Sequence, residues 1–167
     1  MSRRREPTST VGWREWVSLP KLHIPAIKAK IDTGARSSAL HALDVQVSRR
    51  DGIDVVRFKV HPFQRDSSTT VSAEAQLVDE REVKSSSGHA ALRPVIRTPL
   101  QLLGQRWPIE LTLTNRDEMG FRMLLGRQTL RGRFLVDPGR SFFAGKPGSP
   151  IPSQAPFPRR SHHGGGS

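Results

Sequence analysis

Residues 30–42 read KIDTGARSSALHA and centre the chain on one acidic turn. Apolar residues dominate 24–31 and favour a buried strand, so Asp32 is expected where that strand ends. Gly34 permits backbone conformations closed to larger residues, its amide can donate to Asp32, and the Thr33 hydroxyl can anchor the turn. An acid held in this way suits catalysis. Asp-Thr-Gly is also an ordinary Asx turn, so the motif alone leaves both interpretations open.

Length and composition narrow the class of protein. The chain has 167 residues, enough for one domain with a substantial core or for half of a two-fold assembly. It contains no cysteine, which excludes disulfides, thiolate zinc sites and a cysteine nucleophile, and suits a reducing compartment. The sequence shows neither an apolar run of membrane-spanning length nor a secretion signal at its start. We therefore expect a cytoplasmic protein that does not enter a membrane.

The chain is strongly basic. Its formal net charge is +12 and its pI is about 11.5, which predicts attraction to nucleic acid, anionic membrane or acidic polypeptide. Part of this charge lies near the ends, in residues 3–5 and 159–160. We recognise no recognition helix, aromatic-rich RNA-binding strand or basic zipper. Only nonspecific binding to nucleic acid is therefore expected.

Most of the chain has the pattern of strands and turns. Asp51-Gly52 is a strong hairpin signal, residues 54–61 alternate apolar with charged side chains, and residues 71–77 and 107–114 alternate as well. We predict an all-β domain over 11–143, with a disordered basic tail at 1–10. A disordered tail rich in Pro, Gly and Ser is predicted at 144–167. Residues 93–103 contain Pro94 and Pro99, which predicts an edge or broken strand.

A second motif lies late in the chain. Residues 121–130 read FRMLLGRQTL, two aliphatic residues and a glycine followed by a short predicted helix that Gly132 would stop. An early Asp-Thr-Gly with this motif behind it resembles the retropepsins, the single-domain aspartic peptidases typified by retroviral proteases. That resemblance implies a closed β-barrel with one short C-terminal helix. It also implies catalytic Asp32, an active-site loop of Thr33, Gly34 and Ala35, and a support strand of Leu124, Leu125 and Gly126. Arg127 opens the helix and, with Arg36, is a candidate for binding substrate.

IPAIKAKIDTGARSSALHA, VDEREVKSSSGHAALRPVIRT and the stretch from Ile109 to Phe143 give a more specific match. Over about residues 13–143 the chain resembles a bacterial, RimB-like family of retropepsin-like proteins that carries the label ATP-dependent zinc protease. The sequence has no HExxH motif and no Walker loop, and His23, His41, His61 and His89 lack metal-ligand spacing. We therefore expect no metal and no cofactor. Family members occur beside ATP-grasp ligases that add glutamates to ribosomal protein, so the resemblance implies a link to that modification.

The chain departs from retroviral enzymes after the motif. Those enzymes continue with acidic residues that pair with the helix arginine, whereas this chain continues with Arg36 and Ser37. Arg127 then needs another partner, for which Asp137 and Glu110 are candidates, or the cleft is left basic. A basic cleft, to which Arg93 and Arg97 could add, would favour an acidic polypeptide substrate.

Other residues are weaker site candidates. Ser86, Gly88 and His89 belong to a loop that could cover the cleft, or that is simply a flexible connection. Neighbouring serines and a histidine in one loop rarely reach triad geometry, so serine hydrolysis is disfavoured. His41 could contact substrate, although a structural histidine is the commoner case.

Only one Asp-Thr-Gly occurs in the chain, whereas the retropepsin mechanism needs two facing carboxylates. The hypothesis therefore requires a homodimer with its site on the two-fold axis. In such a dyad one acid stays protonated, so activity is expected to be highest on the acidic side of neutral and to need no metal. The alternative is a noncatalytic basic β-barrel module that binds acidic protein or RNA.

Overall fold

The computed structural model describes residues 9–63, 68–84, 87–115 and 120–146, and this part of the chain is almost entirely β-structure. A 3₁₀ turn at Pro20–Leu22 follows the second strand. The all-β class with one short helix late in the chain is confirmed. In chain order the elements are β1 Ser9–Val11, β2 Arg14–Leu19, β3 Ile24–Asp32, β4 Ser38–His41, β5 Leu43–Arg50, β6 Ile53–Val60, β7 Val71–Lys84, β8 Ala90–Leu102, β9 Gln105–Thr114, β10 Met123–Gly126, α1 Arg127–Leu130 and β11 Phe134–Val136.

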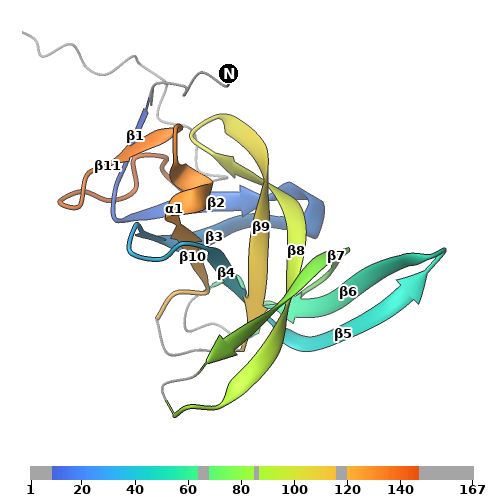
Figure 1. Cartoon of the computed structure of the whole chain (residues 1–167). Coiled ribbons are helices and arrows are strands. Elements are labelled where there is room, and N and C mark those ends of the chain that lie inside the picture. Colours follow the sequence, from blue (N-terminus) through green and yellow to red (C-terminus); the bar gives the residue numbers. More distant parts are fainter. Residues whose placement is uncertain (1–8, 64–67, 85–86, 116–119, 147–167) are drawn as a thin grey trace, which may run out of the picture.

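Six strands close into a barrel. The main sheet has the order β2-β3-β10-β4-β9-β8-β7-β6-β5, and β2 also pairs with β8 between Ser18 and Gln101. That pairing joins the first strand of the order to the sixth. The remaining strands, β7, β6 and β5, extend the sheet outward as an arm (Figure 1). The predicted closed barrel is confirmed.

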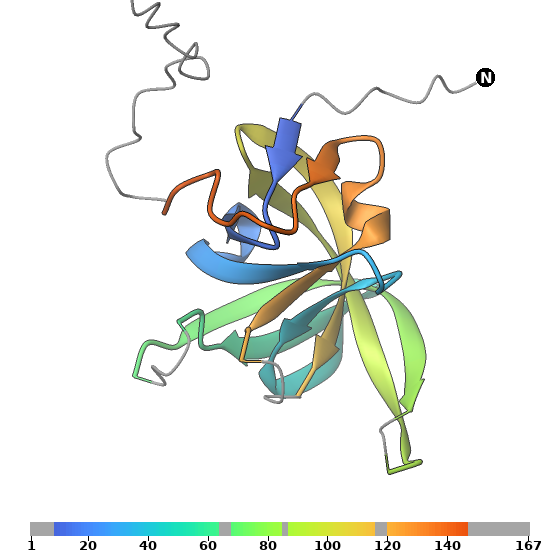
Figure 2. The same ribbon diagram turned by 90° about the vertical axis from the view of Figure 1, so that its left-hand side faces the viewer.

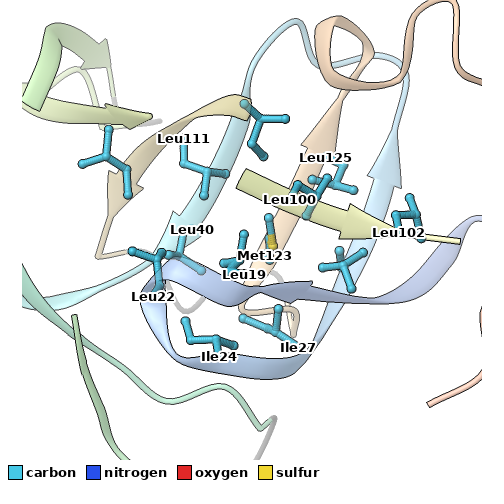
Figure 3. Close-up of a cluster of buried hydrophobic side chains, with 14 of the residues drawn as sticks. Leu19, Leu22, Ile24, Ile27, Leu40, Leu100, Leu102, Leu111, Met123 and Leu125 are labelled. Atoms are coloured by element: carbon cyan, nitrogen blue, oxygen red, sulfur yellow. The ribbon is translucent and has the colours of Figure 1, made fainter. Parts of the chain in front are cut away.

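The barrel interior is filled by aliphatic side chains from different strands (Figure 3). Because side chains of a strand alternate between its two faces, each strand contributes every second residue to this core. Leu19 of β2, Ile27 of β3, Leu40 of β4, Leu100 of β8 and Leu125 of β10 all have no exposed surface. The apolar periodicity of the sequence thus places β3, β4 and β10 around one core.

The arm begins with the hairpin that the sequence predicts. Asp51 and Gly52 have positive φ angles of 53° and 79°, which suit the tight turn between β5 and β6. On β7, Glu74 accepts bonds from Arg57 and Arg50, each at 2.9 Å. Its hydrogen bond with Arg57 lowers the pKa of Glu74. These exposed ion pairs hold the three strands of the arm in register.

The expectation for residues 93–103 is wrong. Residues 93–102 belong to β8, a continuous strand of 13 residues that lies between β7 and β9, and residue 103 is in the turn that follows. Pro99 stands opposite Pro108, a position at which neither strand needs an amide donor. Pairing with β7 ends at Ile96, so the other edge of β8 at Pro99 lacks β7 as well. Pro99 is therefore accommodated in a strand of the barrel wall, and Pro94 lies just before the pairing of β8 with β9 begins at Val95.

Both ends of the domain reach beyond the expected limits of 11 and 143. β1 pairs in parallel with β11, with Thr10 opposite Leu135. At the other end, the Ala144 amide donates to Glu15 at 3.0 Å. Ser9, Thr10 and Ala144 therefore belong to the ordered chain, because strand pairing and a buried carboxylate hold them there.

Glu15 is a buried clamp on the last described segment. It has no exposed surface and accepts hydrogen bonds from the amides of Gly12 at 2.7 Å, Phe143 at 3.1 Å and Ala144 at 3.0 Å. The Trp13 amide donates to the Arg140 carbonyl at 2.8 Å in the same region. Residues 140–144 are thereby fastened to the strand that precedes β3.

Candidate active site

Asp32 is the last residue of β3 and is half-buried, while the next two residues are exposed. The Gly34 amide donates to Asp32 Oδ1 at 3.0 Å, and the Ala35 amide donates to the Asp32 carbonyl at 3.2 Å. The carboxylate is therefore oriented by its own turn. This is the rigid acidic turn that the sequence predicts.

The strand β10 passes between β3 and β4 (Figure 1). It runs parallel to β3, with Gly126 beside Asp32 and Leu124 beside Lys30, and antiparallel to β4, with Leu124 opposite Ala39. Leu124 and Leu125 are buried, and Gly126 ends the strand at the level of the acid. The two motifs are thus brought together as the resemblance implies.

Backbone and side-chain bonds join the acidic turn to α1. The Arg127 amide donates to the Ala35 carbonyl at 2.8 Å, and the Gln128 amide donates to the Arg36 carbonyl at 3.2 Å. The Arg127 side chain donates through Nη1 to the Gly34 carbonyl at 3.2 Å. The turn carrying Asp32 is therefore bonded to α1 through the carbonyls of Gly34, Ala35 and Arg36.

The carboxylate partners expected for Arg127 are not found. Glu110 instead takes Arg81 at 2.9 Å and Arg97 at 3.6 Å. Asp137 accepts a bond from the amide of Gly139 within its own turn. Arg127 finds a backbone carbonyl in place of a carboxylate because α1 begins directly beside the acidic turn.

A buried hydroxyl pair completes the support, and the sequence analysis missed it. Ser38 Oγ and Thr129 Oγ1 lie 2.6 Å apart, and both residues are buried. The Gly126 amide donates to Ser38 Oγ at 3.0 Å. A lone serine and a lone threonine 91 positions apart give no sequence signal. Only their packing across β4 and α1 identifies them.

Gly126 is fixed by lack of space. A Cβ atom added there would lie 2.5 Å from the Ser37 carbonyl oxygen and 2.9 Å from that of Ala35, distances that real side chains do not tolerate. We expect Gly126→Ala to lower the free energy of unfolding by about 1–3 kcal/mol, because the turn must move away from β10. Chemical denaturation measures this.

Gly139→Ala is the matched control, since its Cβ would meet only the Asp137 side chain, at 3.4 Å. Equal stabilities of the Gly126 and Gly139 variants would show that the turn yields freely. In that case the close approach of Gly126 to the carbonyls of Ser37 and Ala35 would not constrain the turn.

The remaining candidates differ in exposure and in position along the chain. Arg36 is exposed beside the turn, whereas His41 is 7% exposed and ends β4 opposite Thr114. Gly88 and His89 are exposed where the β7–β8 hairpin extends from the barrel (Figure 2). Ser86 lies outside the described residues.

Two kinds of feature are absent from the described residues. These residues contain no group of three or more His, Cys, Asp and Glu side chains that could hold a metal ion. In the same ranges no helix has the length and apolar character needed to cross a membrane.

Comparison with curated proteins reveals relatives that are named probable alpha-L-glutamate ligase. A Desulfotalea psychrophila protein named probable alpha-L-glutamate ligase is 51% identical over 128 residues, 77% of this chain and 28% of that protein. A Shewanella pealeana protein of that name is 46% identical over 138 residues, 83% of this chain and 30% of that protein. The chain thus spans less than a third of the length of these relatives.

The fold and the family are shown by two further matches. A crystal structure of a Legionella pneumophila protein of unknown function superposes with a TM-score of 0.68 at 29% identity, covering 81% of this chain and 98% of that one. The family model described as retropepsin-like aspartic endopeptidase RimB matches residues 10–147. With the Asp-Thr-Gly turn packed against Gly126 and α1, the chain belongs to the RimB-like family of retropepsin-like proteins.

Proposed function

We propose that this chain is an aspartic endopeptidase whose site forms between two copies. The observation that carries the proposal is the Asp32 carboxylate, oriented by the Gly34 amide at 3.0 Å on an exposed turn that β10 and α1 brace from behind. A carboxylate held in a fixed orientation on an exposed turn is what general acid–base catalysis needs. The chain holds one such motif, so a second copy must supply the facing carboxylate.

The chemistry follows from two carboxylates that share one proton. The ionised Asp32 takes a proton from water, and the oxygen of that water bonds to the carbonyl carbon of the peptide. The protonated Asp32 of the second copy donates its proton to the carbonyl oxygen. When the carbon–nitrogen bond then breaks, one hydroxyl of the intermediate returns its proton to the second Asp32 and becomes a carbonyl oxygen, and the leaving nitrogen takes the proton that the first Asp32 had removed from water.

The substrate in this proposal is an acidic polypeptide, with a glutamate-extended ribosomal protein as the specific candidate. A net charge of +12 favours acidic partners. Relatives that are 51% and 46% identical to this chain over the matched residues are named probable alpha-L-glutamate ligase, which supports a functional link to a glutamate ligase of the ATP-grasp class. The absence of cysteine fits a cytoplasmic setting.

A cleavage assay tests the proposal with two synthetic peptides, one ending in a run of glutamates and one in a matched run of glutamines. We expect faster cleavage of the glutamate peptide and inhibition by a pepstatin-type compound. Turnover per chain should rise with protein concentration, because the site needs two copies. A chelator should have no effect.

Three outcomes would contradict the proposal. The first is loss of activity in chelator that zinc restores, and the second is full activity from a monomer at every concentration. The third is binding of acidic peptide or RNA without any cleavage, which would instead support a noncatalytic basic module.

A further inference from the structure

The outer face of β3 carries a second charged residue beside the candidate catalytic acid. Ala29 and Ile31 are buried in the barrel, and the half-buried Lys28, Lys30 and Asp32 alternate with them. Residues two apart on a strand point to the same side, so Lys30 and Asp32 share a face about 6.6 Å apart along the chain. Lys30 therefore lies on the same strand face as the acid that would activate the attacking water.

Another cation stands directly across from Lys30. Arg14 of β2 is its partner in the antiparallel register, so both side chains are on one face. The Arg14 guanidinium carbon lies 4.5 Å from the centre of the Trp13 ring and 4.7 Å from that of Phe142. These rings fix the position of the guanidinium. On the other side, Lys30 is next to the 7% exposed Leu124.

Within the described ranges no anionic side chain pairs with these two cations. Neither Lys30 nor Arg14 forms an ion pair with a carboxylate of the described chain, Asp32 included. Arg14 Nε is buried and has no hydrogen-bond partner among the described residues. Like charges directly opposite each other on paired strands are destabilising, and a buried unbonded donor adds to that cost. A bound carboxylate would relieve both.

We propose that Lys30 and Arg14 form a carboxylate-binding subsite for one acidic side chain of a peptide, at a residue next to the cleaved bond. Leu124 supplies an apolar wall for the methylene groups of that side chain, and the two cations meet its carboxylate. Its place beside the cleaved bond rests on the proposed peptidase function. Binding of the acidic side chain does not depend on cleavage.

The residues of this subsite are less exposed than Arg36, the arginine that the sequence places beside the acidic turn. Arg36 is exposed, so its attraction to an acidic peptide falls as salt screens it. Lys30 and Arg14 are half-buried, so their contact with a carboxylate should persist at high salt. Preference for glutamate that survives in about 0.5 M salt is therefore assigned to the pair.

The test measures binding on the Asp32→Asn protein, in which cleavage does not complicate the result. Fluorescently labelled oligo-glutamate and oligo-glutamine peptides are titrated by anisotropy in 0.5 M salt, with and without Lys30→Met. We expect tighter binding of the glutamate peptide. Lys30→Met should reduce that preference about tenfold or more, and Lys30→Arg should restore it.

Lys28→Met is the matched control, because Lys28 has the same charge and strand face but stacks on Trp16 at 5.4 Å and lies four residues before Asp32. It should leave the preference nearly unchanged. Equal losses in the two variants, or equal binding of the two peptides from the start, would overturn the subsite. Tight binding of single-stranded RNA that Lys30→Met weakens equally would also overturn it in favour of a general anion surface.

The result separates the two proposals. Discrimination that depends on Lys30, together with an unmodified chain that cuts no peptide, would support the subsite and reject the peptidase. Peptidase activity without any glutamate preference would do the reverse. Finally, in an active enzyme, a single glutamate moved along a glutamine peptide should speed cleavage at one position only, and Lys30→Met should remove that effect.

Discussion

Asp32→Asn is expected to reduce peptide cleavage at least about 10³-fold while leaving the fold and peptide binding intact. Asparagine has nearly the shape of aspartate and keeps an oxygen for the Gly34 amide, which now lies 3.0 Å from Asp32 Oδ1. It cannot take a proton from water as a carboxylate does. Single-turnover cleavage, circular dichroism and peptide binding measure the three quantities.

Asp54→Asn is a suitable control, since Asp54 is an exposed carboxylate on the arm. It should retain the activity of the unmodified chain. If Asp32→Asn also retained activity, Asp32 would lose its catalytic role, and with it the proposed peptidase mechanism.

Mixing the Asp32→Asn chain with the unmodified chain tests the shared site. If both carboxylates are needed, equal amounts that exchange freely should keep about a quarter of the activity at constant total protein, because only that fraction of dimers has two intact chains. Chains that act independently would keep about half. The mixture thus tests the dimer without any interface variant.

Glu15→Ala is expected to have the largest effect on stability, a loss of about 3–5 kcal/mol in the free energy of unfolding. Three backbone amides, those of Gly12, Phe143 and Ala144, would lose their acceptor. Glu15 is fully buried, so water cannot readily replace it. Urea denaturation measures the loss, and proteolysis should then reach the segment 140–144 first.

Two variants control for side-chain size and charge. Glu15→Gln keeps one acceptor oxygen and should lose less stability than Glu15→Ala. Glu82→Ala removes an exposed carboxylate on β7 and should change stability by less than about 0.5 kcal/mol. An unfolding midpoint of Glu15→Ala equal to that of the unmodified chain would show that the clamp contributes nothing.

Local sequence was sufficient for several features of the site. Asp-Thr-Gly predicts a turn that bonds its own acid, and Gly34 donates to Asp32 as expected. The FRMLLGRQTL motif predicts a buried strand that ends in a glycine and a short helix, and Met123–Gly126 with Arg127–Leu130 match it. In each case the signal lies within about ten residues, where backbone preferences and apolar alternation act directly.

Local sequence gave the wrong position for β8, because strand order depends on distant parts of the chain. Pro94 and Pro99 suggest an edge strand, yet β8 lies between β7 and β9. The missing amide of Pro99 is tolerated because Pro99 faces Pro108 and because β7 pairs with β8 no further than Ile96. The consequence of a missing amide depends on what stands opposite it. That neighbour belongs to a distant part of the chain.

The family, the acidic turn and the apolar core could be predicted from the sequence, since these depend on motifs and on the period of two. That Arg14 stands opposite Lys30, that Ser38 contacts Thr129 and that Glu15 binds the Phe143 amide could be seen only in the folded chain. Such partners are fixed by strand register and barrel closure, which sum many weak contacts over the whole chain. The alternation of a strand therefore predicts which face a charged residue occupies, whereas its partner across the sheet is known only from the folded barrel.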